Sequence, residues 1–143
     1  MKQPKFTYED GHATCITEDN LGRIFKGEAW CNPEDKEFES VLTGSTIAEM
    51  RAQIAAAKTY RDDLKIKLIG LNQLLYSMNQ SQYFNPHSYE AKMLYRQIRF
   101  TKLDLDIAKH QLAVLKLDLY EYINDKDVLH KKLKERRDAT KLS

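Results

Sequence analysis

The sequence contains little that would reveal a function directly. Its 143 residues include two cysteines, three prolines and one tryptophan. No run of about 18 apolar residues is present that could cross a bilayer, so we expect no membrane partner. The first residues contain lysine but no apolar segment typical of a secretory signal, and we therefore expect a cytoplasmic protein. The formal charge of +2 is too small to require nucleic acid.

Motifs for catalysis, metal binding and phosphate binding are also missing. The four histidines form no His-x-x-x-His pair, the cysteines form no Cys-x-x-Cys pair, and neither a nucleophile elbow nor a glycine-rich loop occurs. His110 lies among apolar positions of an expected helix, which favours a packing role over chemistry. Asp104 and Asp106 are two residues apart on that helix and face different directions. We therefore predict a protein that is not an enzyme, with no catalytic residues, metal or cofactor.

The N-terminal part, residues 1–44, is predicted to form a small antiparallel β-ribbon and a short helix. Strands are expected at 6–8, 12–17 and 23–30, with a polar turn that ends at Gly22. A lone ribbon is marginally stable in water, so its apolar face should rest on the helices or on a second subunit. The candidates for that face are Ile16, Ile24 or Phe25, and Trp30. Cys15 and Cys31 fall on neighbouring strands and are expected to be reduced thiols.

Residue types after the ribbon indicate where the helices begin. Asn32 and Pro33 followed by acidic residues are typical of a helix start, and this short helix is expected to reach about Leu42 and to end at Gly44. A first long helix is expected over 45–79, a connection over 80–86, a second long helix over 87–138, and a tail over 139–143. Two long helices joined by a short connection should form an antiparallel hairpin.

The second long helix is unusual because it carries two apolar stripes. One stripe alternates spacings of three and four residues through Ala91, Leu94, Ile98, Leu105, Ala108, Leu112, Leu115, Leu119, Tyr122, Leu129 and Leu133. The other consists of Met93, Phe100, Leu103, Ile107, Val114 and Leu117. A helix with two apolar stripes must be covered from two sides, and this chain has one other long helix to offer. The sequence therefore predicts a single α+β domain whose helical hairpin forms an intersubunit bundle.

Helix lengths lead to the same expectation. The second helix should outrun the first by about 30 Å, which leaves the residues after Leu119 without a partner helix. The ribbon and short helix, a second subunit, or a bend near Asn124 would each resolve this. We favour a second subunit with help from the ribbon. An arginine in the seam of the first helix, Arg61, either pairs with a facing acid or points into a polar pocket between subunits.

Aromatic and basic residues gather near the hairpin tip. Tyr83, Phe84 and Asn85 lie in the connection, and Arg96 and Arg99 follow one turn apart on the second helix. An aromatic ring can stack on a purine, and guanidinium groups can bind phosphate, so this set suits a nucleotide. The alternative is that the aromatics plug the tip while the arginines pair with acids. The basic stretch 131–137 could touch nucleic acid or satisfy the helix dipole, and we favour the second interpretation.

One run of residues resembles a known pattern: Gly27-Glu28-Ala29-Trp30-Cys31-Asn32-Pro33-Glu34-Asp35, then Gly44, then Ile47-Ala48-Glu49-Met50-Arg51-Ala52. It is found in small proteins of phages that infect Gram-positive bacteria, and it is most similar to the first family of phage anti-Thoeris proteins. Members of that family are sponges that bind the cyclic ADP-ribose isomer made by a bacterial TIR-domain defence enzyme and hold it uncleaved. The motif covers about residues 21–52, and beyond it the likeness is one of architecture.

The resemblance implies a site between subunits and an oligomer. An aromatic residue, Phe84 or Tyr83 beside Asn85, would stack on the adenine together with Arg96 or Arg99, and Arg23 would contact phosphate. The family forms homodimers, and some members form trimers of dimers with additional sites for cyclic oligonucleotides. From the residues alone, the alternative function is a helical protein-interaction or inhibitor module that acts on a bacterial enzyme.

Overall fold

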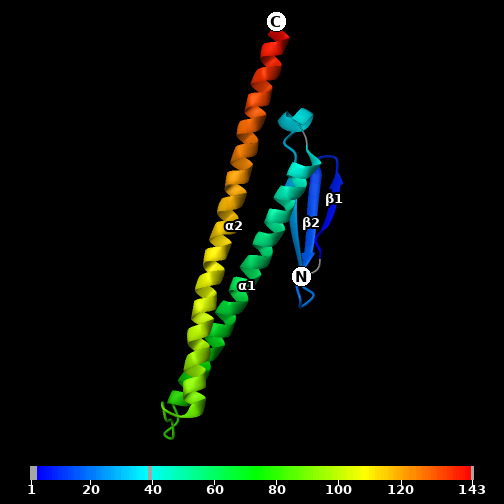
Figure 1. Cartoon of the computed structure of the whole chain (residues 1–143). Coiled ribbons are helices and arrows are strands. Elements are labelled where there is room, and N and C mark those ends of the chain that lie inside the picture. Colours follow the sequence, from blue (N-terminus) through cyan, green and yellow to red (C-terminus); the bar gives the residue numbers. More distant parts are fainter. Residues whose placement is uncertain (1–2, 39, 143) are drawn as a thin grey trace. The chain divides into compact units, whose positions relative to one another are not determined.

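The computed structural model describes residues 3–38 and 40–142 of the chain (Figure 1). A three-stranded antiparallel sheet comes first, formed by β1 (Lys5–Glu9), β2 (His12–Glu18) and β3 (Ile24–Trp30). The short 3-10 helix η1 (Pro33–Phe38) and the long helices α1 (Val41–Asn79) and α2 (Tyr89–Leu142) follow. This confirms the predicted α+β class, with an N-terminal antiparallel sheet, a short helix and two long helices.

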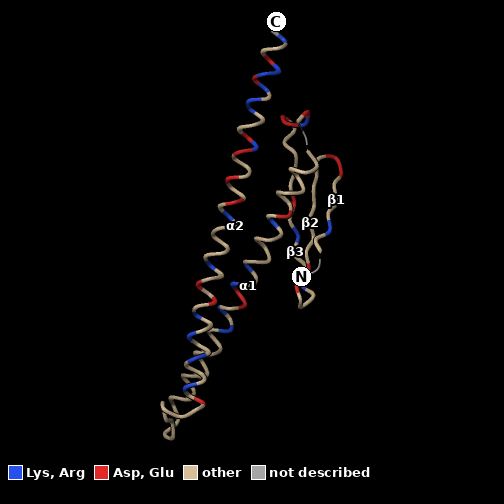
Figure 2. Tube along the Cα trace, in the orientation of Figure 1, with Lys and Arg blue, Asp and Glu red and all other residues tan. Residues whose placement is uncertain are grey.

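The chain divides into two compact units, and α1 and α2 each contribute to both. The sheet unit comprises the residues up to Ala56 together with those from Ala113 onward, and the hairpin unit comprises Ala57–Leu112. No helix among the described residues is long and apolar enough to cross a membrane. Both basic and acidic side chains lie along α2 (Figure 2).

Two tight turns set the order β1-β2-β3. Asp10 and Gly11 both have positive φ, 48° and 78°, as a two-residue hairpin turn requires. They join strands whose last pair is Glu9 with His12. In the second turn the Asp19 carboxylate accepts hydrogen bonds from the backbone N–H groups of Leu21 and Arg23, each at 2.9 Å. The polar turn that was predicted before β3 is therefore held by its own aspartate.

The inner face of the sheet is made of small residues. Ala13, Cys15 and Ala29 are buried against Ile47, Ala48 and Ala52 of α1. A Cβ on Gly27 would lie 1.9 Å from the carbonyl oxygen of Ala48, so the helix backbone comes directly against the strand. The Arg51 guanidinium also donates a hydrogen bond of 2.6 Å to the Glu28 carbonyl oxygen. Small side chains thus allow the backbones of α1 and β3 to touch.

The predicted apolar face of the ribbon is wrong for Ile16, Ile24 and Trp30, whereas Phe25, the alternative to Ile24, is half-buried on the inner face. Ile16, Ile24 and Trp30 are 37%, 68% and 69% exposed, and they lie on the outer face of the sheet. Successive strand residues point to opposite faces, so burial of the small residues necessarily turns the large ones outward. Trp30 instead stacks on the His12 ring, with centroids 3.7 Å apart.

The core of the sheet unit extends to α2. Leu119, Tyr122 and Ile123 pack against the cluster formed by the sheet and α1. The sheet unit of the chain therefore covers these residues in part, as the expected help from the ribbon requires, and the expected cover by a second subunit stays a prediction. Further along α2, Leu129 remains 55% exposed.

Several helix boundaries differ from the prediction. The short helix ends at Phe38, and α1 already begins at Val41. Ser40 caps α1, because its hydroxyl oxygen accepts a hydrogen bond of 3.2 Å from Thr43 N–H. Gly44 therefore lies in the first turn of α1 and does not end a helix; a Cβ there would be 3.2 Å from the Cβ of Ala13. At the other end of the chain, α2 continues to Leu142, past the predicted end at Asp138.

The hairpin unit buries one stripe of α2 as predicted. Ala91, Leu94, Ile98, Leu105, Ala108 and Leu112 are all less than 9% exposed, and Leu64 of α1 packs with Leu105 and Ala108. Arg61 forms its ion pair with the adjacent Asp62, at 3.0 Å, and this acid is a neighbour in sequence and not a facing residue. In the second stripe of α2, Met93 is half-buried, and the other members, Phe100, Leu103, Ile107, Val114 and Leu117, are exposed.

Candidate functional site

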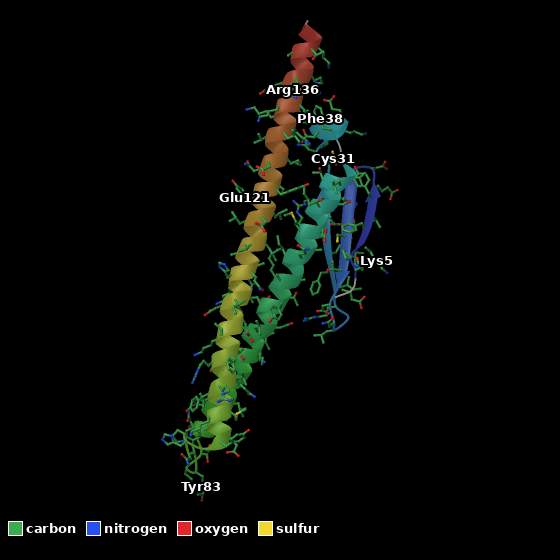
Figure 3. All side chains as sticks on the ribbon, in the orientation of Figure 1. Lys5, Cys31, Phe38, Tyr83, Glu121 and Arg136 are labelled. Atoms are coloured by element: carbon green, nitrogen blue, oxygen red, sulfur yellow. The ribbon has the colours of Figure 1, made fainter. Side chains whose placement is uncertain are left out.

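Three of the predicted site residues lie together at the tip of the hairpin unit. Tyr83, Phe84 and Asn85 line a shallow pocket of about 350 Å³. The remaining lining residues are Met78, Ser81, Ser88 and Glu90. Tyr83 is 85% exposed and projects away from the helices, whereas Phe84 is half-buried (Figure 3).

The backbone of the tip is organised by short polar side chains. Ser81 accepts a hydrogen bond from Tyr83 N–H through its hydroxyl oxygen, at 3.2 Å, and one from Phe84 N–H through its carbonyl oxygen, at 3.1 Å. Asn85 accepts one of 2.9 Å from His87 N–H. Ser88 caps α2 by accepting one of 3.2 Å from Ala91 N–H. The Asn85 side-chain oxygen is thus used by the turn, and its NH₂ group is the donor that remains for a ligand.

The structure does not bring the predicted arginines into this pocket. Arg96 and Arg99 lie on the exposed surface of α2, and neither lines the pocket. Arg96 is six residues beyond Glu90, which corresponds to about 9 Å along the helix. Within the described part of the chain, no ion pair joins either arginine to an acid, so the alternative in which these arginines pair with acids is not observed.

The sixth predicted site residue, Arg23, belongs to the sheet unit. Its Nε donates a hydrogen bond of 2.7 Å to Asp19 Oδ2, in the turn before β3. The guanidinium is therefore engaged in holding this turn, and a phosphate contact would have to compete with the carboxylate.

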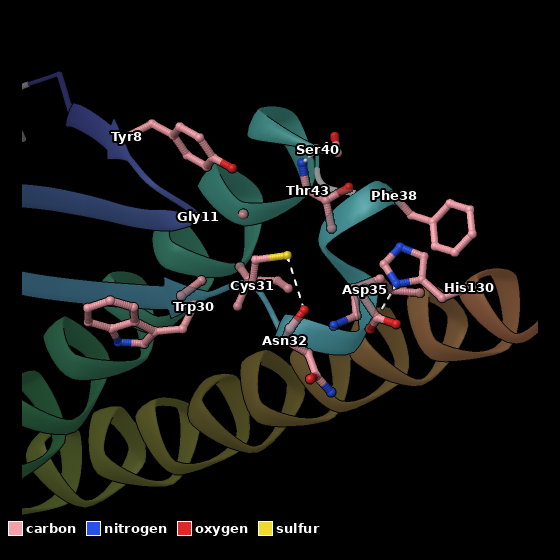
Figure 4. Close-up of a pocket in the computed structure, with 14 residues that line it drawn as sticks. Tyr8, Gly11, Trp30, Cys31, Asn32, Asp35, Phe38, Ser40, Thr43 and His130 are labelled. Carbon is pink, nitrogen blue, oxygen red and sulfur yellow. Dashed lines mark hydrogen bonds and ion pairs between the residues drawn. The ribbon is translucent and has the colours of Figure 1, made fainter. Parts of the chain in front are cut away.

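The sheet unit contains a second pocket, which the sequence had not indicated. Strand ends, η1, the start of α1 and the last part of α2 surround it, and its labelled lining includes Tyr8, Trp30, Cys31, Asp35 and His130 (Figure 4). The enclosed space is about 40 Å³, close to the volume of a single water molecule. The Tyr8 hydroxyl is buried and has no hydrogen-bond partner among the described residues. Cys31 donates a hydrogen bond of 3.5 Å to the Asn32 carbonyl oxygen.

Asp35 anchors η1 to α2 beside this pocket. The residue is only 7% exposed, and its Oδ1 lies 2.7 Å from Lys134 Nζ. His130 Nδ1 lies 3.1 Å from Asp35 Oδ2, but the two atoms are not oriented for a hydrogen bond. Lys134 is therefore the stronger partner of Asp35. The hydrogen bond from Lys134, followed by the contact with His130, lowers the pKa of Asp35. The same hydrogen bond raises the pKa of Lys134.

Two further contacts strengthen this attachment. Arg137 pairs with Glu37, and its guanidinium carbon lies 6.0 Å from the centre of the Phe38 ring. The Phe38 ring in turn lies 5.8 Å from the ring of His130. Two cations of the basic stretch, Lys134 and Arg137, therefore serve the fold of the sheet unit. Sequence reasoning missed this network because its partners are about 100 residues apart.

The described residues offer no cluster of three or more His, Cys, Asp or Glu side chains that could hold a metal ion. Comparison of the chain with known protein families, curated proteins and solved structures finds no match.

Proposed function

We propose that the protein is an anti-defence sponge, which binds a cyclic ADP-ribose isomer and sequesters it without cleaving it. The observation that carries the proposal is the tip of the hairpin unit, where two aromatic rings and an amide line one pocket. The likeness of residues 27–52 to the phage anti-Thoeris motif suggests which nucleotide to test.

The tip residues supply the contacts that a nucleotide needs. Stacking of a base on an aromatic ring contributes about 1–3 kcal/mol, and Phe84, which is half-buried, is held more firmly than the exposed Tyr83. The Asn85 NH₂ group can donate to a base or a ribose. Arg96 and Arg99 have no acidic partner among the described residues, so their guanidinium groups are available for phosphate oxygens.

Sequestration also requires slow release of the ligand, because differences in affinity arise mostly from the dissociation rate. A ligand that is enclosed by protein dissociates more slowly than one in an open pocket. The tip pocket of one chain is open on the solvent side. A homodimer, or a trimer of dimers, would close the pocket and bring further cationic groups to it. The exposed second stripe of α2 supports such an assembly, since apolar surface of this kind marks an interaction site.

The same exposed stripe also favours the alternative function. A helical inhibitor of a bacterial enzyme would use an apolar helix face to dock on its target. In that case the face would remain uncovered in the isolated protein, whereas in the sponge it would be covered by a second copy.

Ligand capture tests the proposal directly. The protein is incubated with the TIR-enzyme product, freed of unbound ligand and heat-denatured, and the supernatant is analysed for nucleotide. We expect intact nucleotide to be released. No nucleotide, or a hydrolysed one, would contradict the proposal.

Two variants locate the site. Loss of one stacked base contact corresponds to a roughly 5- to 150-fold weaker affinity, so Phe84→Ala should release far less nucleotide than the unsubstituted protein. Tyr60→Ala is the matched control, because Tyr60 is also an exposed aromatic of the hairpin unit but does not line the tip pocket. Equal capture by both variants would show that Phe84 is not the base platform.

A further inference from the structure

The pocket of the sheet unit has a buried polar group that the fold leaves unused. The Tyr8 hydroxyl oxygen lies in its wall and has no hydrogen-bond partner in the described part of the chain. The Tyr8 ring points toward the first turn of α1, and a Cβ on Gly44 in that turn would lie 3.6 Å from the edge of this ring (Figure 4). A buried hydroxyl without a partner is destabilising, and a ligand that accepts its hydrogen bond removes this effect.

The start of α1 lines the same pocket. Ser40, Thr43 and Gly44 belong to the lining, and Gly44 N–H donates a hydrogen bond of 3.0 Å to the Ser40 carbonyl oxygen. The first N–H groups of a helix have no acceptor within the helix and give this end a partial positive charge. The Ser40 hydroxyl oxygen accepts from Thr43 N–H, which leaves the hydroxyl hydrogen as a further donor. The Tyr8 hydroxyl therefore lies beside the positive end of a long helix.

The charged side chains of the pocket leave a cation for a ligand. Asp35 is the acid among the described lining residues, and its carboxylate is already paired with Lys134 at 2.7 Å and lies 3.1 Å from His130. Lys126 also lines the pocket, and its ion pair, at 3.3 Å, is with the exposed Asp127. An ion pair with an exposed carboxylate is weak, so Lys126 can exchange it for a ligand with little loss of free energy.

The size and the walls of the pocket limit what it can hold. Trp30, Phe38 and Ile47 contribute aromatic and apolar surface. The enclosed space of about 40 Å³ has room for one small polar group, whereas sites for larger organic ligands measure about 300–1,000 Å³. A water molecule would accept from the Tyr8 hydroxyl but would leave the positive charge of Lys126 and α1 unmatched. A small anion satisfies both.

We propose that this pocket binds a small carboxylate, of the size of acetate. Its oxygens accept hydrogen bonds from the hydroxyl groups of Tyr8 and Ser40 at the start of α1, and Lys126 balances its charge. An ionised carboxylate has acceptors only, which matches the donors that these residues offer, and hydrogen bonds to an ionised group are the stronger kind. The inference goes beyond the proposed function, because the site lies in the sheet unit and uses no residue of the tip.

Tryptophan fluorescence reports on the site, because Trp30 lines the pocket and is the single tryptophan of the chain. The full chain is titrated with sodium acetate while sodium chloride keeps the ionic strength constant. We expect a saturable change with a dissociation constant of about 1 mM, since so small a ligand cannot bind tightly. Acetamide, which has a similar shape but no charge, should bind at least about tenfold more weakly. No saturable response to acetate, or an equal response to acetamide, would overturn the proposal.

Variants locate the bound carboxylate. Y8F removes only the hydroxyl and should raise the dissociation constant for acetate about tenfold or more, as expected for loss of a hydrogen bond to an ionised group. Y60F is the matched control, because it removes the hydroxyl of an exposed tyrosine in the hairpin unit, and it should leave the constant unchanged. Equal constants for Y8F and the unsubstituted protein would overturn the proposal. Because these titrations omit the nucleotide, their failure is distinct from failure of ligand capture.

Discussion

Replacement of Gly27 by alanine is the sharpest test of how the sheet unit is built. The new Cβ would lie 1.9 Å from the Ala48 carbonyl oxygen and 2.4 Å from the Ala52 backbone nitrogen. Both contacts are far below van der Waals distance, and both atoms belong to a helix backbone that cannot rotate aside. To accept one methyl group, α1 must move away from β3, and the contacts of Ala29, Ala48 and Cys15 must loosen with it.

Other glycines of the chain supply graded controls for this change. Overpacking of a tight core lowers the free energy of unfolding by about 1–3 kcal/mol and occasionally more. Because the new Cβ of Gly27→Ala would clash with backbone atoms, we expect a loss of about 3 kcal/mol or more for this variant. The new Cβ of Gly44→Ala would lie 3.2 Å from the Cβ of Ala13, so we expect this variant to be destabilised by about 1 kcal/mol. Gly70 lies in the middle of α1, and a Cβ added there would have no atom within 4 Å. Gly70→Ala should therefore stabilise the protein by about 1 kcal/mol, because alanine favours a helix more than glycine does.

Urea unfolding followed by circular dichroism measures all three variants at one protein concentration, so that self-association affects them equally. The expected order of midpoints is Gly70→Ala above the unsubstituted protein, then Gly44→Ala, then Gly27→Ala. A Gly27→Ala protein within about 0.5 kcal/mol of the unsubstituted one would refute the close approach of α1 to β3. A destabilised Gly70→Ala protein would show instead that the surroundings of α1 are not those described.

Two further predictions concern the pocket of the sheet unit. Because the pKa of Asp35 is lowered in the folded protein, its contribution to stability is present above the unfolded value of 3.8 and is lost as the pH falls through the folded value. The Asp35→Asn protein should therefore have a lower free energy of unfolding than the unsubstituted protein at pH 7, and the difference between the two should become smaller only below pH 3.8. A difference in stability that does not depend on pH would exclude the ion pair of Asp35. Tyr8→Phe removes a buried hydroxyl for which the described part of the chain offers no partner, and this change should stabilise the protein by about 1 kcal/mol in thermal unfolding. Destabilisation would reveal a hydrogen-bond partner, such as a bound water.

The order of elements could be predicted because each has its own spacing signal. Alternation and turn residues located all three strands to within one residue at each end. The spacing of three and four residues identified both long helices and the buried stripe of α2. The start of the second long helix, predicted at residue 87, lies at Tyr89, directly after the capping residue Ser88.

Contacts between distant segments could not be predicted in the same way. Hydrophobicity pointed to Ile16, Ile24 and Trp30 as the packed face of the sheet, yet close approach of two backbones selects small residues and leaves the large ones outside. Asp35 gave no local sign of its role, since Lys134 lies 99 positions away. The same holds for the candidate site. Tyr83 to Asn85, which are neighbours in sequence, line one pocket, whereas Arg96 and Arg99 lie outside it.

The motif on which the family resemblance rests is used largely for packing. Gly27, Ala29, Ala48 and Ala52 form the contact between sheet and α1, and Asp35 ties η1 to α2. Each of these residues is explained by the fold, whatever the protein binds, so the motif supports an arrangement of elements more strongly than it supports a ligand. The specificity of the proposed sponge would have to reside in the tip and in the unpaired arginines of α2, which lie outside the motif. Ligand capture by tip variants is therefore a more direct test of function than any further likeness in residues 21–52.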